Sequence, residues 1–364
     1  MYKVQPDIRF KKEIARISGS PLGECIQCGN CSVVCSLAPE ERPFPRKEMS
    51  WAGWGLKDKL LGNPDIWLCH QCGDCSTYCP RGVRPSDVIA AVRKVTIRDY
   101  ARPKFLGKML SNPAYLPVAI AIPVIIISAI LIAAGTFRIP EGPVNYSKFF
   151  PHIWLNTTFT LITLLFYGMF VIGLIRFWKD MKQNIPGGER ELSLIKSVKK
   201  VIGEVLRHSE FSGCKSSKPR NLAHILVFYG FILLLVVTLY AIVASITKNY
   251  PLAFTNPFKI LGNIASLMLY AGIMIMMIRR LFDRGSAGNS SYEDWLLLVS
   301  VLLLTLSGTL VEAARFLDWR SAYHLYFFHL VCVWFVIMYL PYTKLGHILY
   351  RTLAMVYARS VGRN

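Results

Sequence analysis

Long runs of apolar residues alternate with shorter polar segments over most of this 364-residue chain. Each of six runs is close to the roughly 20 residues that a helix needs to cross the hydrocarbon core of a membrane. Apolar and polar positions usually alternate more evenly in a soluble protein. The pattern therefore predicts six transmembrane helices, at about 114–136, 154–177, 222–246, 259–278, 294–313 and 323–342.

Residues 1–108 are mixed and polar, and we expect them to form a separate cytoplasmic domain ahead of a membrane domain over 109–364. The fold class is therefore mainly α. Within the basic segment 179–220, residues 191–208 have apolar positions at helical spacing with lysines between them. This pattern is typical of a helix at the membrane surface, or of a helix packed on the N-terminal domain.

The net charge of +20 does not indicate nucleic acid, because most Lys and Arg flank the apolar runs. Segment 179–220 alone carries ten of them, and others follow the fourth and sixth runs. Basic connections stay on the cytoplasmic side of a membrane. No charged, short apolar stretch with a cleavage site opens the chain, so we expect no signal peptide. Both termini and segment 179–220 are thus predicted to face the cytoplasm, with the protein in the inner membrane.

Eight of the ten cysteines lie in the first 79 residues, within CIQCGNCSVVC and CHQCGDCSTYCP. Both stretches follow C-x2-C-x2-C-x3-C, the run that holds [4Fe–4S] clusters in bacterial ferredoxins. Zinc sites usually separate two C-x2-C pairs by a longer loop, and disulfides are uncommon in a reducing cytoplasm. The spacing therefore favours two iron–sulfur clusters.

In this motif three cysteines wrap one cluster and the fourth reaches the neighbouring one. Gly29 and Gly73 permit the tight turn that the wrapping loop needs. The predicted ligand sets are Cys25, Cys28, Cys31 and Cys79 for the first cluster, and Cys69, Cys72, Cys75 and Cys35 for the second.

Four histidines lie in or at the ends of the apolar runs, where an ionisable side chain indicates a functional site. A b-type haem needs two axial ligands, and facing helices can supply them. His224 and His347 fall at the predicted cytoplasmic side, and His152 and His329 at the opposite side. We therefore expect a proximal haem on the first pair and a distal haem on the second. The alternative is that these histidines only form hydrogen bonds between helices.

His329 and His347 are 18 residues apart, which is five turns of an uninterrupted helix. On such a helix both project from one face, separated by about 27 Å. His70 and His208 lie in polar loops, where a solvated or supporting role is the simpler interpretation.

Together these motifs resemble the C-subunit of the quinone-interacting membrane-bound oxidoreductase (Qmo) complex of sulfate reducers. That family looks like a fusion of the iron–sulfur C-subunit of heterodisulfide reductase with the membrane cytochrome b of the same enzyme, its E-subunit. The second part is similar to the gamma subunit of respiratory nitrate reductase, through NLAH at 221–224 and FHLV and PYTKLGH within 328–347.

The resemblance implies that His224 and His347 bind the proximal haem and His329 the distal one. The family's second histidine, ten residues after His224, is replaced by Leu234, so the distal haem needs another ligand, for which His152 is the candidate. It also implies electron exchange between menaquinol and flavin-containing cytoplasmic subunits that serve adenylylsulfate reductase.

Two alternatives remain open. The chain can be the membrane anchor of another heterodisulfide-reductase-like or formate-linked complex, or a haem-free ferredoxin-type maturation factor in the membrane. The paired histidines argue against the second. Residues 1–108 contain 18 Lys and Arg but only 11 Asp and Glu, and this basic balance favours an acidic partner. The sequence does not identify the quinone-binding residues; charged candidates near the run ends are Arg220, Glu312, Arg315 and Lys344.

Overall fold

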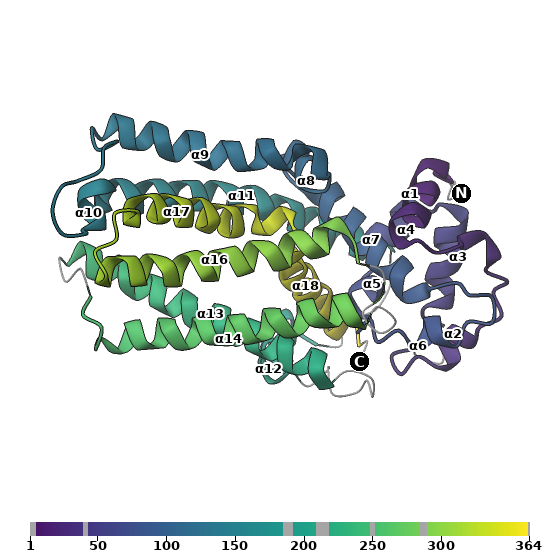
Figure 1. The fold of residues 1–364 in the computed structure, drawn as a ribbon. Helices are drawn as coiled ribbons and strands as arrows, with labels where there is room; N and C mark the ends of the chain where they lie inside the picture. The colour runs from purple at the N-terminus through teal and green to yellow at the C-terminus, as the bar shows by residue number, and fades with distance from the viewer. Residues whose placement is uncertain are drawn as a thin grey trace.

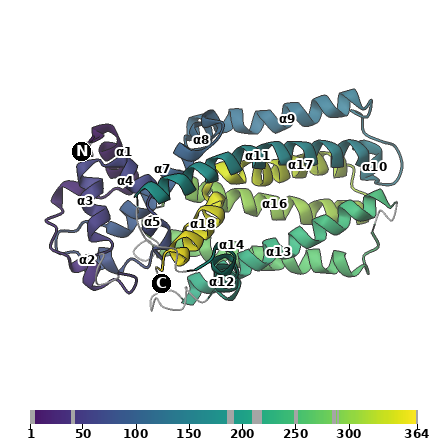
Figure 2. The same ribbon diagram turned by 180° about the vertical axis from the view of Figure 1, so that it is seen from behind.

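A computed structural model describes residues 5–38, 43–184, 192–208, 218–247, 252–283, 288 and 290–362. Parts of the basic segment 179–220, including Cys214, lie outside these residues, as does Arg284. The described chain is all helical, with the N-terminal domain at one end of a long bundle (Figures 1 and 2). The mainly α fold predicted from the sequence is confirmed.

Short helices build the N-terminal domain around α7, whose buried face supplies much of its core. Asp7 caps the first helix by accepting a hydrogen bond from the Phe10 amide at 2.9 Å, and Pro85 stands in the first turn of α7. The helices are α1 (Ile8–Ser18), α2 (Asn30–Val33), α3 (Arg46–Trp54), α4 (Lys57–Leu61), α5 (Asp65–Leu68), α6 (Asp74–Thr77), α7 (Pro85–Tyr100) and α8 (Lys104–Leu110).

Six helices among the described residues are long and apolar enough to cross a membrane, as predicted. They contain α9 (Leu116–Ala133), α11 (His152–Asn184), α13 (Lys218–Ile246), α14 (Pro257–Phe282), α16 (Tyr292–Phe316) and α17 (Ala322–Tyr339). The short α10 (Tyr146–Phe149) precedes α11. Their outward faces expose large apolar side chains, for example Leu161, Leu164, Leu239 and Val243. Lipid contact explains this exposure, so the chain is a multi-pass membrane protein.

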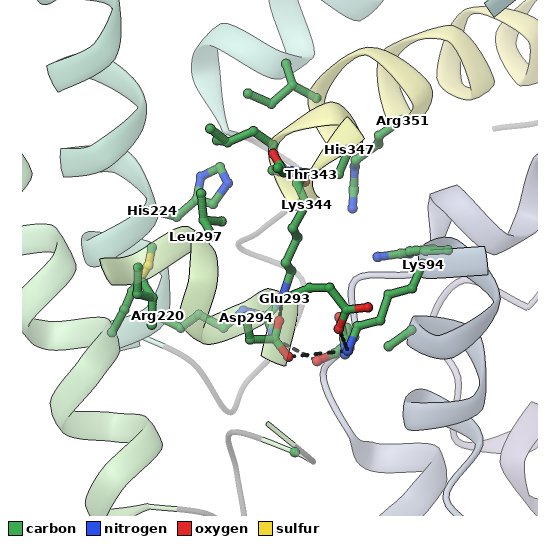
Figure 3. A pocket seen from close by; sticks show the side chains of 18 of the residues that line it. Lys94, Arg220, His224, Glu293, Asp294, Leu297, Thr343, Lys344, His347 and Arg351 are labelled. Atoms are coloured by element: carbon green, nitrogen blue, oxygen red, sulfur yellow. Dashed lines mark hydrogen bonds and ion pairs between the residues drawn. The ribbon is translucent and has the colours of Figure 1, made fainter. Parts of the chain in front are cut away.

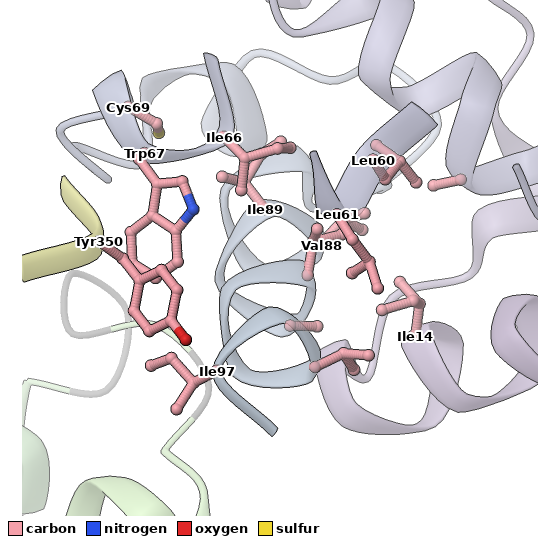
Figure 4. Packing of buried hydrophobic residues seen from close by; sticks show 14 of the residues in the cluster. Ile14, Leu60, Leu61, Ile66, Trp67, Cys69, Val88, Ile89, Ile97 and Tyr350 are labelled. Carbon is pink, nitrogen blue, oxygen red and sulfur yellow. The ribbon is translucent and has the colours of Figure 1, made fainter. Parts of the chain in front are cut away.

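The helix α11 joins the bundle to the N-terminal domain. Its 33 residues span about 50 Å, more than a membrane core requires. Phe177 and Met181 in its last turns belong to the core of the N-terminal domain. Tyr350 enters the same core and stacks on Trp67 with ring centroids 5.3 Å apart (Figure 4). The two domains therefore share one hydrophobic core.

The last membrane helix does not continue to His347, so the expectation of one helix carrying both His329 and His347 is wrong. α17 ends at Tyr339, two 3-10 turns follow (Leu340–Tyr342 and Lys344–Gly346), and α18 (His347–Ser360) runs across the bundle (Figures 1 and 2). Pro341 has no amide hydrogen to continue the helix. Gly346 allows the close turn, since an added Cβ would lie 3.0 Å from the Pro341 carbonyl oxygen.

The basic segment contains α12 (Leu194–Arg207), which has one broad apolar face. At one edge of this face Val201 packs with Met355 and Val356 of α18, near Leu68 of the N-terminal domain. The other edge is exposed and carries Ile195, Val198, Ile202 and Leu206. The helix thus packs against the C-terminal helix and keeps an apolar stripe suited to a membrane surface.

Candidate functional site

The structure brings the cysteines together in two hollows that mix the two motifs. One hollow is lined by Cys25, Cys28, Cys31 and Cys79. The other is lined by Cys35, Cys69, Cys72 and Cys75. Each therefore has three thiols from one motif and the fourth cysteine of the other. We call the first the outer hollow and the second the inner hollow, because Cys72 and Gly73 of the second also line a cavity formed with the membrane helices.

The two motifs fold into matching loops. Gly29 and Gly73 have φ values of 89° and 93°, and each precedes a single helical turn. Gln27 and Gln71 also have positive φ, at 58° and 53°. Such a backbone curls around the space in front of it, and a side chain at either glycine would be strained.

Thiolates in these hollows are disfavoured by burial and by one another. Among the residues that the structure describes, no three Cys, His, Asp or Glu side chains gather closely enough to hold one metal ion. Burial, together with the neighbouring thiols Cys25, Cys28 and Cys79, raises the pKa of Cys31 to about 11. Burial likewise raises the pKa of Cys75. A bound cluster would stabilise the thiolates that burial disfavours.

A cavity of about 980 Å³ lies between the inner hollow and the membrane helices. Its volume is at the upper end of cofactor sites, roughly 300–1,000 Å³. Cys72 and Gly73 line it from the second motif, and His224 and His347 line it from α13 and α18 (Figure 3). The cavity thus connects one cysteine motif to two of the histidines singled out from the sequence.

The hydrogen bonds of His224 fix which ring nitrogen is left for the cavity. Its Nδ1 lies 3.1 Å from Nε2 of His208, whose own Nδ1 lies 3.4 Å from the Leu206 carbonyl oxygen. A carbonyl can only accept, so His208 donates to it through Nδ1 and accepts from His224 through Nε2. His224 therefore keeps its Nε2 lone pair unprotonated.

His347 also keeps an unprotonated Nε2, because of a different hydrogen bond. Its Nδ1 donates to the Lys344 carbonyl oxygen at 2.6 Å, which leaves Nε2 with a lone pair. Burial lowers the pKa of His347 to about 4, so the ring stays neutral near neutral pH. Two neutral imidazoles on one cavity fit the axial ligation of a b-type haem.

The acid Asp294 gathers three cations beside the cavity. Its carboxylate is 4% exposed and lies 3.4 Å from the Lys94 ammonium and 3.5 Å from the Arg280 guanidinium. Lys344 completes the group (Figure 3). These cations come from α7, α14 and the turn before α18, so the group ties the N-terminal domain to the membrane helices.

The second histidine pair is placed differently. His329 on α17 lies with its Nδ1 2.9 Å from the Ser307 hydroxyl of α16, and Gly308 leaves room for its ring. His152 is the first residue of α11. Leu234, at the position of the missing family histidine, packs with Val227, Phe231 and Leu269. A distal haem on His329 and His152 stays a prediction.

Two features of the site were not predicted from the sequence. His208 was expected to be a solvated loop residue, but it is 6% exposed and bonded to His224. Its position directly after an amphipathic helix is the sequence feature that could have indicated its burial. Arg93, Arg220 and Arg351 all donate to the second motif loop, although only Arg220 was singled out, as a quinone candidate.

Comparison with known proteins supports both parts. Residues 21–83 match the family model of a 4Fe-4S dicluster domain, and residues 107–364 match that of Citrate utilization protein B. Citrate utilization protein B of Escherichia coli is 25% identical over 356 residues, which cover 91% of this chain and 88% of that protein.

Heterodisulfide reductase proteins match parts of the chain. A protein of Archaeoglobus profundus that is like the C-subunit of this enzyme is 35% identical over 94 residues, 26% of this chain and 50% of that protein. The E-subunit of the dihydromethanophenazine:CoB–CoM heterodisulfide reductase of Methanosarcina thermophila is 27% identical over 206 residues, 52% of this chain and 75% of that protein.

The chain is therefore a fusion of a two-cluster iron–sulfur domain with a membrane domain. It is a membrane-anchored electron-transfer protein related to the C- and E-subunits of heterodisulfide reductase. Since the second family model covers more than half of its length, the protein belongs to the Citrate utilization protein B family.

Proposed function

We propose that this protein exchanges electrons between menaquinol in the membrane and flavin-containing cytoplasmic subunits of the same complex. One observation carries the proposal: a single cavity is bounded by the inner cysteine loop on one side and by two neutral histidines on the other. A cluster on the cysteine loop and a haem on the two histidines would then lie on opposite sides of one cavity, an arrangement that supports electron transfer across the domain boundary.

The two hollows support the proposed ligand sets. The outer cluster is held by Cys25, Cys28, Cys31 and Cys79, and the inner cluster by Cys35, Cys69, Cys72 and Cys75. His224 and His347 hold the proximal b haem through Nε2. When bound, these groups supply one-electron carriers, while the protein sets their ligation, spacing and exclusion of water.

A distal b haem on His329 and His152 is part of the proposal. Ser307 holds the Nδ1 side of His329, which leaves Nε2 for a ligand. The Ser307 hydroxyl already donates to the Leu304 carbonyl, so it accepts from the histidine.

The orientation rests on charge. Basic residues flank the ends of α11, α13, α14 and α17 that adjoin the N-terminal domain, and such ends stay cytoplasmic. We therefore propose that both termini, the cysteine domain and the cavity lie on the cytoplasmic side of the inner membrane.

Two physiological roles are candidates, and they differ in the partner proteins that they require. The resemblance to the C-subunit of the quinone-interacting oxidoreductase complex favours a link to adenylylsulfate reductase in sulfate respiration. The whole-length similarity to Citrate utilization protein B of Escherichia coli favours the same electron transfer in the service of citrate use. Co-purification and a deletion strain distinguish the two roles. Co-purified flavoproteins of heterodisulfide-reductase type would support the first role. Their absence, together with a growth defect of the deletion strain on citrate, would support the second.

A dithionite-reduced minus oxidised absorption spectrum of the purified protein tests the haem assignment. We expect a b-type α-band in the wild-type protein, and loss of one haem in His347→Ala. Intact iron and sulfide content with no α-band at all would support the haem-free maturation factor instead.

A further inference from the structure

The loop of the second motif is held by arginines from three different helices. Arg93 of α7 donates to the carbonyl oxygens of Ile66 at 2.7 Å and Cys69 at 2.5 Å. Arg220 of α13 donates to the Gln71 carbonyl at 2.7 Å and also to that of His70. Arg351 of α18 donates to the Cys69 carbonyl at 3.3 Å.

Two of these arginines are placed one helical turn from the cavity histidines. Arg220 precedes His224 by four residues on α13, and Arg351 follows His347 by four residues on α18. Residues four apart share a helix face. Each histidine-bearing helix therefore presents an imidazole and a guanidinium side by side, the guanidinium reaching the cysteine loop.

The outer hollow has a different charge environment. Cys28 is exposed there, whereas Cys69 in the inner loop is only 8% exposed. Two arginines line the outer hollow, Arg46 and Arg81; both are exposed, and Arg81 is paired with Glu24. Water screens such exposed charges, but it screens the partly buried arginines of the inner loop much less.

A cluster with four thiolate ligands is negatively charged, and it becomes more negative when it takes up an electron. Fixed positive charges nearby stabilise the reduced form and raise the reduction potential. Hydrogen bonds to three successive carbonyls also hold the loop, and with it the cluster, against the two histidine helices.

We propose that Arg93, Arg220 and Arg351 position the inner cluster and raise its reduction potential above that of the outer cluster. An electron shared by the pair then resides on the inner cluster: the outer cluster is oxidised, the inner one is reduced, and no bond is made or broken. The inference rests on the proposed cluster ligands, and it adds the order of the two potentials and the residues that set it.

The test is an anaerobic redox titration followed by electron paramagnetic resonance (EPR), on the full-length protein in detergent. Cys75→Ser identifies the signal of the inner cluster. We expect Arg220→Met to lower the midpoint potential of that signal alone, and Arg351→Met to lower it less, because its hydrogen bond is longer. Arg220→Lys keeps the charge and should retain most of the wild-type potential.

Arg81→Met is the matched control, since it removes an arginine beside the outer hollow whose charge is already paired and exposed. It should leave both midpoint potentials unchanged. Iron and sulfide content serve as the measure of intact clusters, and Arg351→Met replaces Arg220→Met if the latter does not fold.

Intact clusters with an unchanged inner potential in both methionine variants would overturn the inference and leave the proposed function standing. So would equal losses in Arg220→Met and Arg220→Lys, because they would show a structural clamp alone. A wild-type protein without two cluster signals would instead contradict the proposed function.

Discussion

The two cysteine loops share their spacing and backbone conformation, but their surroundings differ. The outer loop presents exposed apolar side chains to solvent, Ile26 at 63% and Val33 at 85%. The inner loop is covered by α7, α13 and α18 and opens on the cavity that holds His224 and His347. Two motifs with the same spacing therefore have different surroundings. The outer site is open to a soluble partner, and the inner one faces the membrane domain.

The strongest effect is expected from substituting the fourth cysteine of each motif, since each is predicted to bind the cluster of the other motif. Cys79 belongs to the second motif but lies in the outer hollow. Cys79→Ser should therefore abolish or alter the EPR signal of the outer cluster, and Cys35→Ser that of the inner cluster. If Cys79→Ser changed only the inner signal, each motif would bind its own cluster.

The second prediction compares Asp294, which is buried beside the cavity, with Glu24, which is exposed and paired with Arg81. Asp294→Leu leaves Lys94, Arg280 and Lys344 without their buried acid, so we expect it to destabilise the fold by about 3–5 kcal/mol. Glu24→Gln breaks an exposed pair and should cost about 0–1 kcal/mol. Thermal unfolding in detergent measures both, and similar losses would refute the structural role of the Asp294 group.

The third prediction compares two tryptophans. Trp67 is 1% exposed and stacks on Tyr350, whereas Trp54 is 64% exposed. Trp67→Ala should cost about 3 kcal/mol, since it empties the core shared by the two domains. Trp54→Ala should change stability by less than about 0.5 kcal/mol. The same unfolding assay decides, and a neutral Trp67→Ala would mean that the domains are not joined through this core.

The smallest effect is expected at His208, and it tests whether this residue orients His224. His208→Leu removes the acceptor that orients His224, and loss of such a partner weakens ligation by roughly 10- to 100-fold. Haem content of the purified variant, measured against added haemin, reports the loss. The exposed His324→Leu on α17 is the control. Equal haem affinity in the two variants would exclude a positioning role for His208.

The membrane helices were predictable because apolar run length has one simple cause, the thickness of the bilayer. The tight cysteine loops followed in the same way from Gly29 and Gly73. Both features are local, so a single stretch of sequence contains the information.

The long-range features were not predictable. Counting turns from His329 to His347 assumed an unbroken helix, and Pro341 with Gly346 redirects the chain between them. The burial of His208 and the carbonyl contacts of Arg93 and Arg351 depend on how α12, α7 and α18 pack. Nothing in the local sequence specifies which backbone carbonyl a distant arginine will reach.

We propose that electrons pass between the inner cluster and the membrane through the His224 and His347 site. The most direct test mixes stoichiometrically reduced protein with a menaquinone analogue and follows the EPR signals of the clusters. The wild-type clusters should be reoxidised, whereas His347→Ala, with both clusters intact, should stay reduced far longer. Reoxidation at the wild-type rate in that variant would contradict the account.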